Sequence, residues 1–320
     1  MLRIRCPEPE LRKSIRIDYL FQEMDAWISS DALTKLVRAF SGQMPENLDL
    51  KSRIYWLNSF VNIWDYRKKQ ANGGERWQIK DDQQVKNNKE LILSCARELG
   101  LIDAFDPIMP PDFLLPLGGA RLTNYVRPLS AKHLVEVHGY KNLKVVALSG
   151  KRPINVIEKP FLMEYAPNAQ TEFDAISSGL AKSFEIFDKD FEEDDYEDNN
   201  INLSWSVRHF LQRPNGIDLF SLAAPSTVPK RRANSIDTFI FFLDHFNIKK
   251  GQRLLLVTSS IYVPFQLLRF MPYAIDQGFY VDCVGCDPSL PSSSFSQPSN
   301  YLQEIKATVN AMADLVKRYL

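Results

Sequence analysis

The sequence has few cysteines, no excess charge of either sign and no long apolar run. Its four cysteines are scattered over 320 residues, too few for a disulfide framework, which is typical of a reducing compartment. Lysine plus arginine and aspartate plus glutamate number 39 each, so no overall field attracts nucleic acid or a membrane surface. No stretch approaches the roughly 20 apolar residues of a membrane span, and the charged N-terminus lacks a signal-peptide core. We therefore expect a cytoplasmic protein that binds neither nucleic acid nor membrane.

The signatures of several enzyme classes are also missing. A Walker P-loop, G-x-G-x-x-G and G-x-S-x-G are absent, which argues against an ATPase, an ordinary dinucleotide site and a hydrolase nucleophile elbow. No Asp/Glu/His cluster has ligand spacing, and Cys283-Val284-Gly285-Cys286 is a lone C-x-x-C within a strand-like run, so no metal site is predicted. The four histidines lie away from the expected strand ends and are not favoured as catalysts. The identity of any cofactor stays open.

Residues 1–108 are expected to form a helical lobe. Apolar residues recur at helical spacing within residues 17–28, 33–40, 54–64 and 91–99. A polar stretch, residues 65–88, separates the last two of these segments. It is either a plain solvated loop or a lid over a binding site, because connections of this length are uncommon unless they are disordered or functional.

From residue 109 onward, short buried strands alternate with helices. Strands are expected at 113–117, 143–148, 217–223, 253–258 and 279–284, and helices at 129–137, 168–187, 234–246, 263–276 and 301–320. This alternation predicts an α/β domain over residues 109–320, with a Rossmann-like parallel sheet and helices on both of its faces.

Two inserts interrupt the alternation. Residues 188–200 are densely acidic, and we expect a mobile, solvated loop because like charges repel one another. The alternative interpretation is an acidic docking surface for a basic partner. Residues 291–300 are rich in serine and proline and are expected to link the domain to its last helix.

Glycine, hydroxyl and cationic residues follow four of the expected strands. These residues are Gly118, Gly119 and Arg121; Ser149, Gly150, Lys151 and Arg152; Ser226, Thr227, Arg231 and Arg232; and Thr258, Ser259 and Ser260. Ligands of open parallel sheets bind beyond the carboxyl ends of the strands. Glycine lets a backbone approach a ligand, hydroxyls and helix N-termini donate to anions, and Arg or Lys neutralises them. The alternative is that these residues only form turns. Four converging loops favour a cleft for a phosphate or carboxylate.

The order of these motifs resembles that of a known family. The motifs are Leu117-Gly118-Gly119 with Arg121 or Arg127, Leu148-Ser149-Gly150, Thr171-Glu172, Asn234-Ser235-Ile236-Asp237-Thr238 and Val257-Thr258-Ser259. Over residues 112–285 the chain is similar to the YdcF/SanA/ElyC-like family of Rossmann-like proteins. Tyr262 and Phe265 stand where that family has His and Arg. The resemblance implies a nucleotide-like or other phosphorylated ligand, or S-adenosylmethionine as in one branch, without a settled reaction. It also implies that Asn234 and Tyr262 line the site.

Glu172 and Asp237 are the acid/base candidates, because each is expected at the start of a helix that faces the cleft. A carboxylate beside a bound phosphate has a raised pKa, and one between arginines has a lowered pKa. The alternative role for both is helix N-terminal capping, which needs no catalysis.

The leading hypothesis is therefore an enzyme, of transferase or hydrolase type, acting on a nucleotide or another phosphorylated metabolite. The first alternative is a non-catalytic module that senses such a ligand. The second is an interaction protein that uses the helical lobe and the acidic segment. The oligomeric state is left open.

Overall fold

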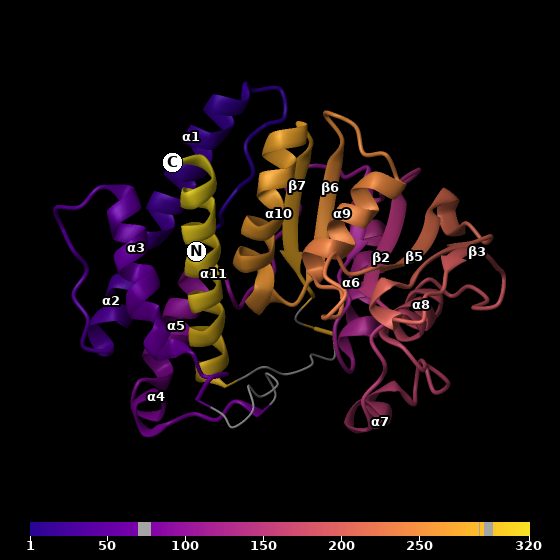
Figure 1. Cartoon of the computed structure of the whole chain (residues 1–320), viewed down its shortest axis with the longest axis horizontal. Coiled ribbons are helices and arrows are strands. Elements are labelled where there is room, and N and C mark those ends of the chain that lie inside the picture. Colours follow the sequence, from indigo (N-terminus) through magenta and orange to yellow (C-terminus); the bar gives the residue numbers. More distant parts are fainter. Residues whose placement is uncertain (70–77, 288, 291–296) are drawn as a thin grey trace. The chain divides into compact units, whose positions relative to one another are not determined.

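The computed structural model describes residues 1–69, 78–287, 289–290 and 297–320 (Figure 1). The chain divides into two compact units. Unit 1 comprises residues 1–103, 260–278 and 294–320, and unit 2 comprises residues 104–259 and 279–293.

Unit 2 contains a sheet of seven strands within the described residues. They are β1 (Phe113–Pro116), β2 (Lys144–Gly150), β3 (Phe191–Tyr196), β4 (Trp205–Phe210), β5 (Asp218–Ala224), β6 (Arg253–Thr258) and β7 (Tyr280–Gly285). The strand order is β3-β4-β5-β2-β1-β6-β7. Strands β5, β2, β1, β6 and β7 are parallel, and β4 and β3 extend the β5 edge in antiparallel fashion.

The parallel strands are buried because helices cover both faces of the sheet. Helices α6 (Thr123–His138) and α8 (Glu172–Ser183) pack on one face, where their apolar side chains join Val145 and Leu219 in a common core. Helix α9 (Ser235–His245) covers the other face, and the ring of its Phe242 lies 5.5 Å from that of Phe113 in β1. The prediction of an α/β protein with a Rossmann-like parallel sheet is confirmed.

Capping residues in the sequence set the starts of the two helices nearest the candidate site. Thr171 accepts a hydrogen bond from the backbone N–H of Asp174 at the start of α8, and Asn234 does the same for Asp237 at the start of α9. In both cases the aspartate returns a bond to the capping residue's backbone, which completes a capping box. The short helices of unit 2 are η3 (Val156–Glu158), α7 (Lys159–Leu162), η4 (Ile201–Leu203) and η5 (Pro214–Gly216).

The expectation of a mobile acidic loop at residues 188–200 is wrong for its central part. Residues 191–196 form strand β3, an edge strand that pairs with β4. Its acidic side chains are exposed, where water and salt screen their repulsion. Glu193 forms an ion pair of 2.7 Å with Arg208, and the ring of Phe191 lies 6.2 Å from that of Phe210. Strand β4 itself was not predicted.

Unit 1 is helical in its described residues. It contains α1 (Lys13–Ile28), α2 (Asp31–Ala39), α3 (Leu50–Phe60), η1 (Val61–Trp64), α4 (Gln83–Asn87), α5 (Lys89–Glu98), η6 (Ser260–Tyr262), α10 (Val263–Gln277) and α11 (Pro298–Tyr319). Helix α11 packs against α3, α5 and α10. The two C-terminal helices thus group with the N-terminal lobe, whereas the sequence assigned them to the sheet domain. Amphipathic periodicity shows that a helix has an apolar face, but it does not identify the partner.

The polar stretch 65–88 contains α4, while its residues 70–77 lie outside the described part of the chain. Its role as a lid therefore stays a prediction. Residues 291–296 of the expected linker lie outside the described part as well, and α11 begins at Pro298, three residues before the predicted start. Within the described ranges, no helix has both the length and the apolar character needed to cross a bilayer.

Candidate functional site

The four glycine-, hydroxyl- and cation-bearing loops follow four neighbouring strands. Strands β5, β2, β1 and β6 lie side by side and run parallel, so their carboxyl ends meet at one edge of the sheet. Gly150 at the end of β2 is in register with Ala224 at the end of β5, and Leu117 bridges to Leu148. The sheet therefore brings together the loops that the sequence singled out.

Ser260 and Tyr262 were also predicted to face the ligand. They lie in η6, which belongs to unit 1. Their contact with a ligand stays a prediction.

Arg127 and Asn124 of α6 hold the loop after β1 in place. The buried Arg127 guanidinium donates to the carbonyl oxygens of Leu117 (2.6 Å) and Gly118 (2.5 Å) and to Ser259 Oγ (3.3 Å). Asn124 exchanges two hydrogen bonds with the backbone of Gly119, at 2.9 and 2.8 Å. These contacts favour a structural role for Arg127, which ties the β1 loop to the β6 loop. Sequence reasoning missed Asn124, because nothing in its spacing marks it.

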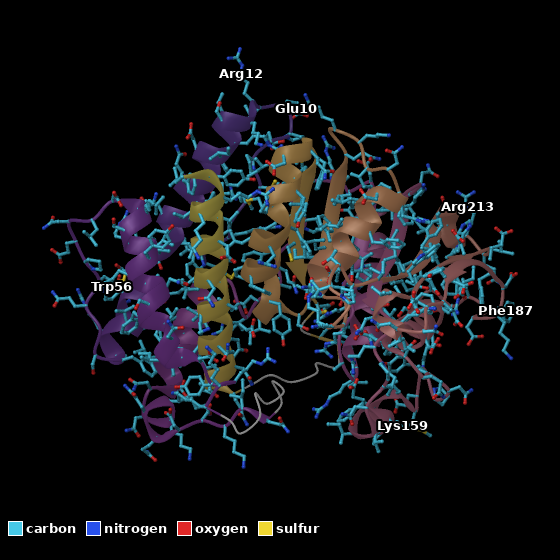
Figure 2. The ribbon with its side chains drawn as sticks, in the orientation of Figure 1. Glu10, Arg12, Trp56, Lys159, Phe187 and Arg213 are labelled. Carbon is cyan, nitrogen blue, oxygen red and sulfur yellow. The ribbon has the colours of Figure 1, made fainter. Side chains whose placement is uncertain are left out.

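A second cluster surrounds Arg152 in the loop after β2. Its guanidinium donates to both carboxylate oxygens of Glu158, at 2.7 and 3.0 Å, and its Nε donates to Glu172 Oε2 at 2.9 Å. The Glu158 side chain is only 1% exposed. Its contact with Arg152 fixes the start of α7, which Figure 2 marks by the label on Lys159. Glu158 was not predicted, since a single glutamate in a loop carries no signal of its burial.

Glu172 keeps one carboxylate oxygen uncommitted. Its Oε2 binds Arg152, while no donor among the described residues reaches Oε1. Oε1 lies so close to Gly118 that a Cβ on that residue would stand 2.6 Å from it and 2.7 Å from the carbonyl oxygen of Leu148. Burial raises the pKa of Glu172, and the neighbouring Arg152 only partly opposes this effect.

Asp237 is saturated with donors. Its carboxylate accepts hydrogen bonds from the Arg231 guanidinium, from the Thr227 hydroxyl (2.5 Å) and N–H (3.3 Å), and from the Asn234 N–H (2.8 Å). Burial alone would raise the pKa of Asp237, but these donors outweigh it and lower the pKa to about 2. The arrangement favours the capping alternative for Asp237 and also for Asn234, whose side chain accepts from two N–H groups of α9.

Several of the predicted hydroxyls already form hydrogen bonds with other groups of the chain. Ser149 Oγ donates to the carbonyl oxygen of Leu222 (3.1 Å), and Ser226 Oγ donates to that of Val228 (2.9 Å). Ser226 fits the turn-forming alternative, whereas Ser149 links β2 to β5. The buried Thr258 Oγ1, at the end of β6, has no partner among the described residues.

Two cations of the loops remain weakly paired. The Lys151 side chain is 13% exposed, and its only carboxylate partner within the described residues is Glu197, whose 84%-exposed side chain lies 3.9 Å away. Arg232 makes no ion pair with the described residues, although its charge acts on Glu172. Arg121, which has a positive φ of 58°, stacks its guanidinium on the ring of Phe161.

The comparisons with known proteins identify relatives without a stated activity. Residues 13–100 match a family model described as the Rv3785 N-terminal domain. The chain is 28% identical to the uncharacterised protein Mb3814 of Mycobacterium bovis, over 92% of its own length and 89% of that protein. The same figures hold for the uncharacterised protein Rv3785 of Mycobacterium tuberculosis. No solved structure gives a significant match.

Proposed function

We propose that unit 2 binds a small anionic ligand, a nucleotide or another phosphorylated metabolite, at the carboxyl edge of β1, β2 and β5. The observation that carries the proposal is Lys151. A cation that is largely removed from water is costly unless an anion pairs with it closely. Glu197 is distant and solvated, so Lys151 and the neighbouring Arg232 leave positive charge in the loops after two adjacent strands.

Within this function, an enzyme and a sensor remain distinct candidates. An enzyme of transferase or hydrolase type needs a group that moves a proton, and Glu172 is the candidate because its pKa is raised and its Oε1 is uncommitted. Asp237 favours the sensor, because its pKa is low and its carboxylate oxygens already accept hydrogen bonds from the chain. It therefore suits a fixed structural anion. Turnover of a bound ligand would separate the two.

The binding proposal is tested by a thermal-shift screen of inorganic phosphate, sugar phosphates, nucleotides and S-adenosylmethionine. A ligand that binds only the folded state raises the melting temperature, with about 2.7 kcal/mol of stabilisation at a hundredfold excess over Kd. Lys151→Ala should weaken binding of a hit by about tenfold, because one charge-assisted contact is lost.

The matched control is Lys141→Ala, which removes an exposed lysine from the segment before β2, at the opposite end of the same strand. It should leave the shift unchanged. The absence of a shift with every anion, or an equal loss in both variants, would contradict the proposal.

A further inference from the structure

Two carboxylates share one guanidinium beside Gly118. Glu158 takes both terminal nitrogens of Arg152, and Glu172 takes its Nε. The three side chains are between 1% and 16% exposed and together carry one net negative charge when all are ionised. Of the four carboxylate oxygens, Glu172 Oε1 is the one that accepts no hydrogen bond from the described residues.

The surroundings restrict what can fill this position. Oε1 lies where a side chain at residue 118 would be, so a residue without a side chain is needed beside it. Lys151 directly precedes Arg152, and the charge of Arg232 also acts on Glu172. A ligand group that carries its own positive charge is disfavoured near these cations, whereas a neutral donor is compatible with them.

We propose that Glu172 Oε1 accepts a hydrogen bond from a hydroxyl group of the ligand, so that the site selects hydroxylated phosphates over simple anions. This inference rests on the proposed function, because Lys151 and Arg232 bind the phosphate while Glu172 binds the hydroxyl. A carboxylate that accepts from a sugar hydroxyl is a common solution in sheets of this type. The ligand class is therefore a sugar phosphate or a ribonucleotide.

The probes are ribose 5-phosphate and inorganic phosphate, measured by isothermal titration calorimetry on the full chain at pH 7.5. The wild-type protein should bind ribose 5-phosphate at least about tenfold more tightly, the size of one hydrogen bond to a charged acceptor. Glu172→Gln should reduce the ratio of the two Kd values to near one, because the amide is a weaker acceptor and its Nε2 can face the ligand.

A second pair of variants tests the contact between Gly118 and Glu172 Oε1 by changing residue 118. Gly118→Ala would place a Cβ 2.6 Å from Oε1 and should abolish the preference, while Lys141→Ala, which removes an exposed lysine at the opposite end of β2, should retain it. The wild-type protein supplies a measurement that needs no substitution. The preference for ribose 5-phosphate should disappear at low pH, when Glu172 becomes protonated. Because the pKa of Glu172 is raised, this loss should occur at a higher pH than it would for an ordinary glutamate.

The outcomes separate the two proposals. Equal affinity of the wild-type protein for both probes, with loss of both in Lys151→Ala, overturns the hydroxyl inference and leaves the proposed function standing. A preference that survives in Glu172→Gln and at low pH also overturns the inference. Binding of neither probe overturns the inference together with the anion-binding function.

Discussion

Replacing Asp237 with alanine should destabilise unit 2 by about 3 kcal/mol, the cost of removing one partner from a buried charge network. The carboxylate caps α9 and accepts hydrogen bonds from Arg231, Thr227 and Asn234. Loss of a cap alone costs about 1 kcal/mol. Bonds to a charged group contribute about 1.5–3 kcal/mol each, but they are not additive and the freed donors partly regain water. Arg231 is partly exposed and can be solvated, which keeps the total near the lower end of the range.

The pH dependence of this effect has a definite sign. The pKa of Asp237 is about 2 in the folded protein, below the ordinary value of 3.8. A carboxylate whose pKa is lowered by folding stabilises the fold at pH values above its pKa in the unfolded state. This stabilisation is lost as the pH falls toward the pKa in the folded state. The difference between wild type and Asp237→Ala should therefore be full at pH 7 and shrink between about pH 4 and pH 2.

Urea denaturation followed by circular dichroism at pH 7 and pH 3 measures both effects. Asp237→Asn keeps the shape and one acceptor oxygen, so it should cost about half as much. Asp244→Ala is the matched control, because Asp244 is an exposed residue near the carboxyl end of the same helix and has no cap to lose. A cost within about 0.5 kcal/mol of wild type for Asp237→Ala would refute the reasoning, since this is the scatter of surface substitutions.

Two further sets of variants test the packing of α8. Gly179→Ala would put a Cβ 2.0 Å from the carbonyl oxygen of Asn124, so α6 and α8 must move apart. We expect the free energy of unfolding, measured by urea denaturation, to fall by about 3 kcal/mol. Gly150→Ala, whose nearest neighbour would be 3.7 Å away, should change it very little. Ser177 and Ser221 share a buried hydrogen bond of 2.6 Å between α8 and β5. Either single alanine variant should cost about 1–2 kcal/mol, because it leaves a buried hydroxyl unpaired, and the double variant should cost less than the sum of the two. Additive losses would show that the two hydroxyls do not interact.

The central strands and the convergence of their loops could be predicted from the sequence. Strands β2 and β6 contain continuous apolar runs of the kind that a sheet buried on both faces requires. Once the strands are parallel, the edge at which their loops meet follows from geometry alone. The start of α9 was predicted to within one residue, with Asn234 as its capping residue, whereas α8 begins at Glu172, four residues after the start that periodicity predicted.

The partners of the polar side chains could not be predicted. Arg127 was taken as a cation for the ligand, but it donates to backbone carbonyls of the β1 loop. Asp237 and Glu172 have the same type of side chain and the same position near a helix start, yet opposite pKa shifts. Burial raises the pKa of Glu172 and Arg152 only partly opposes it, whereas the donors Arg231 and Thr227 outweigh burial and lower the pKa of Asp237. Local pattern contains no information on such contacts.

Most cations near the site already interact with other groups of the chain, which limits the negative charge of a ligand that the site can neutralise. The sequence offered six cations, five of them in three of the loops and Arg127 in α6, and three of the six bind groups of the chain itself. Arg127 binds carbonyl oxygens, Arg152 binds two glutamates and Arg231 binds Asp237. Arg121 stacks on an aromatic ring, so Lys151 and Arg232 are the cations that our proposal assigns to the anion. Two cations suit one phosphate group, and the unmet acceptor at Glu172 adds selectivity through a hydroxyl. We therefore expect the site to discriminate by the shape and donors of a modestly charged ligand more than by its total charge.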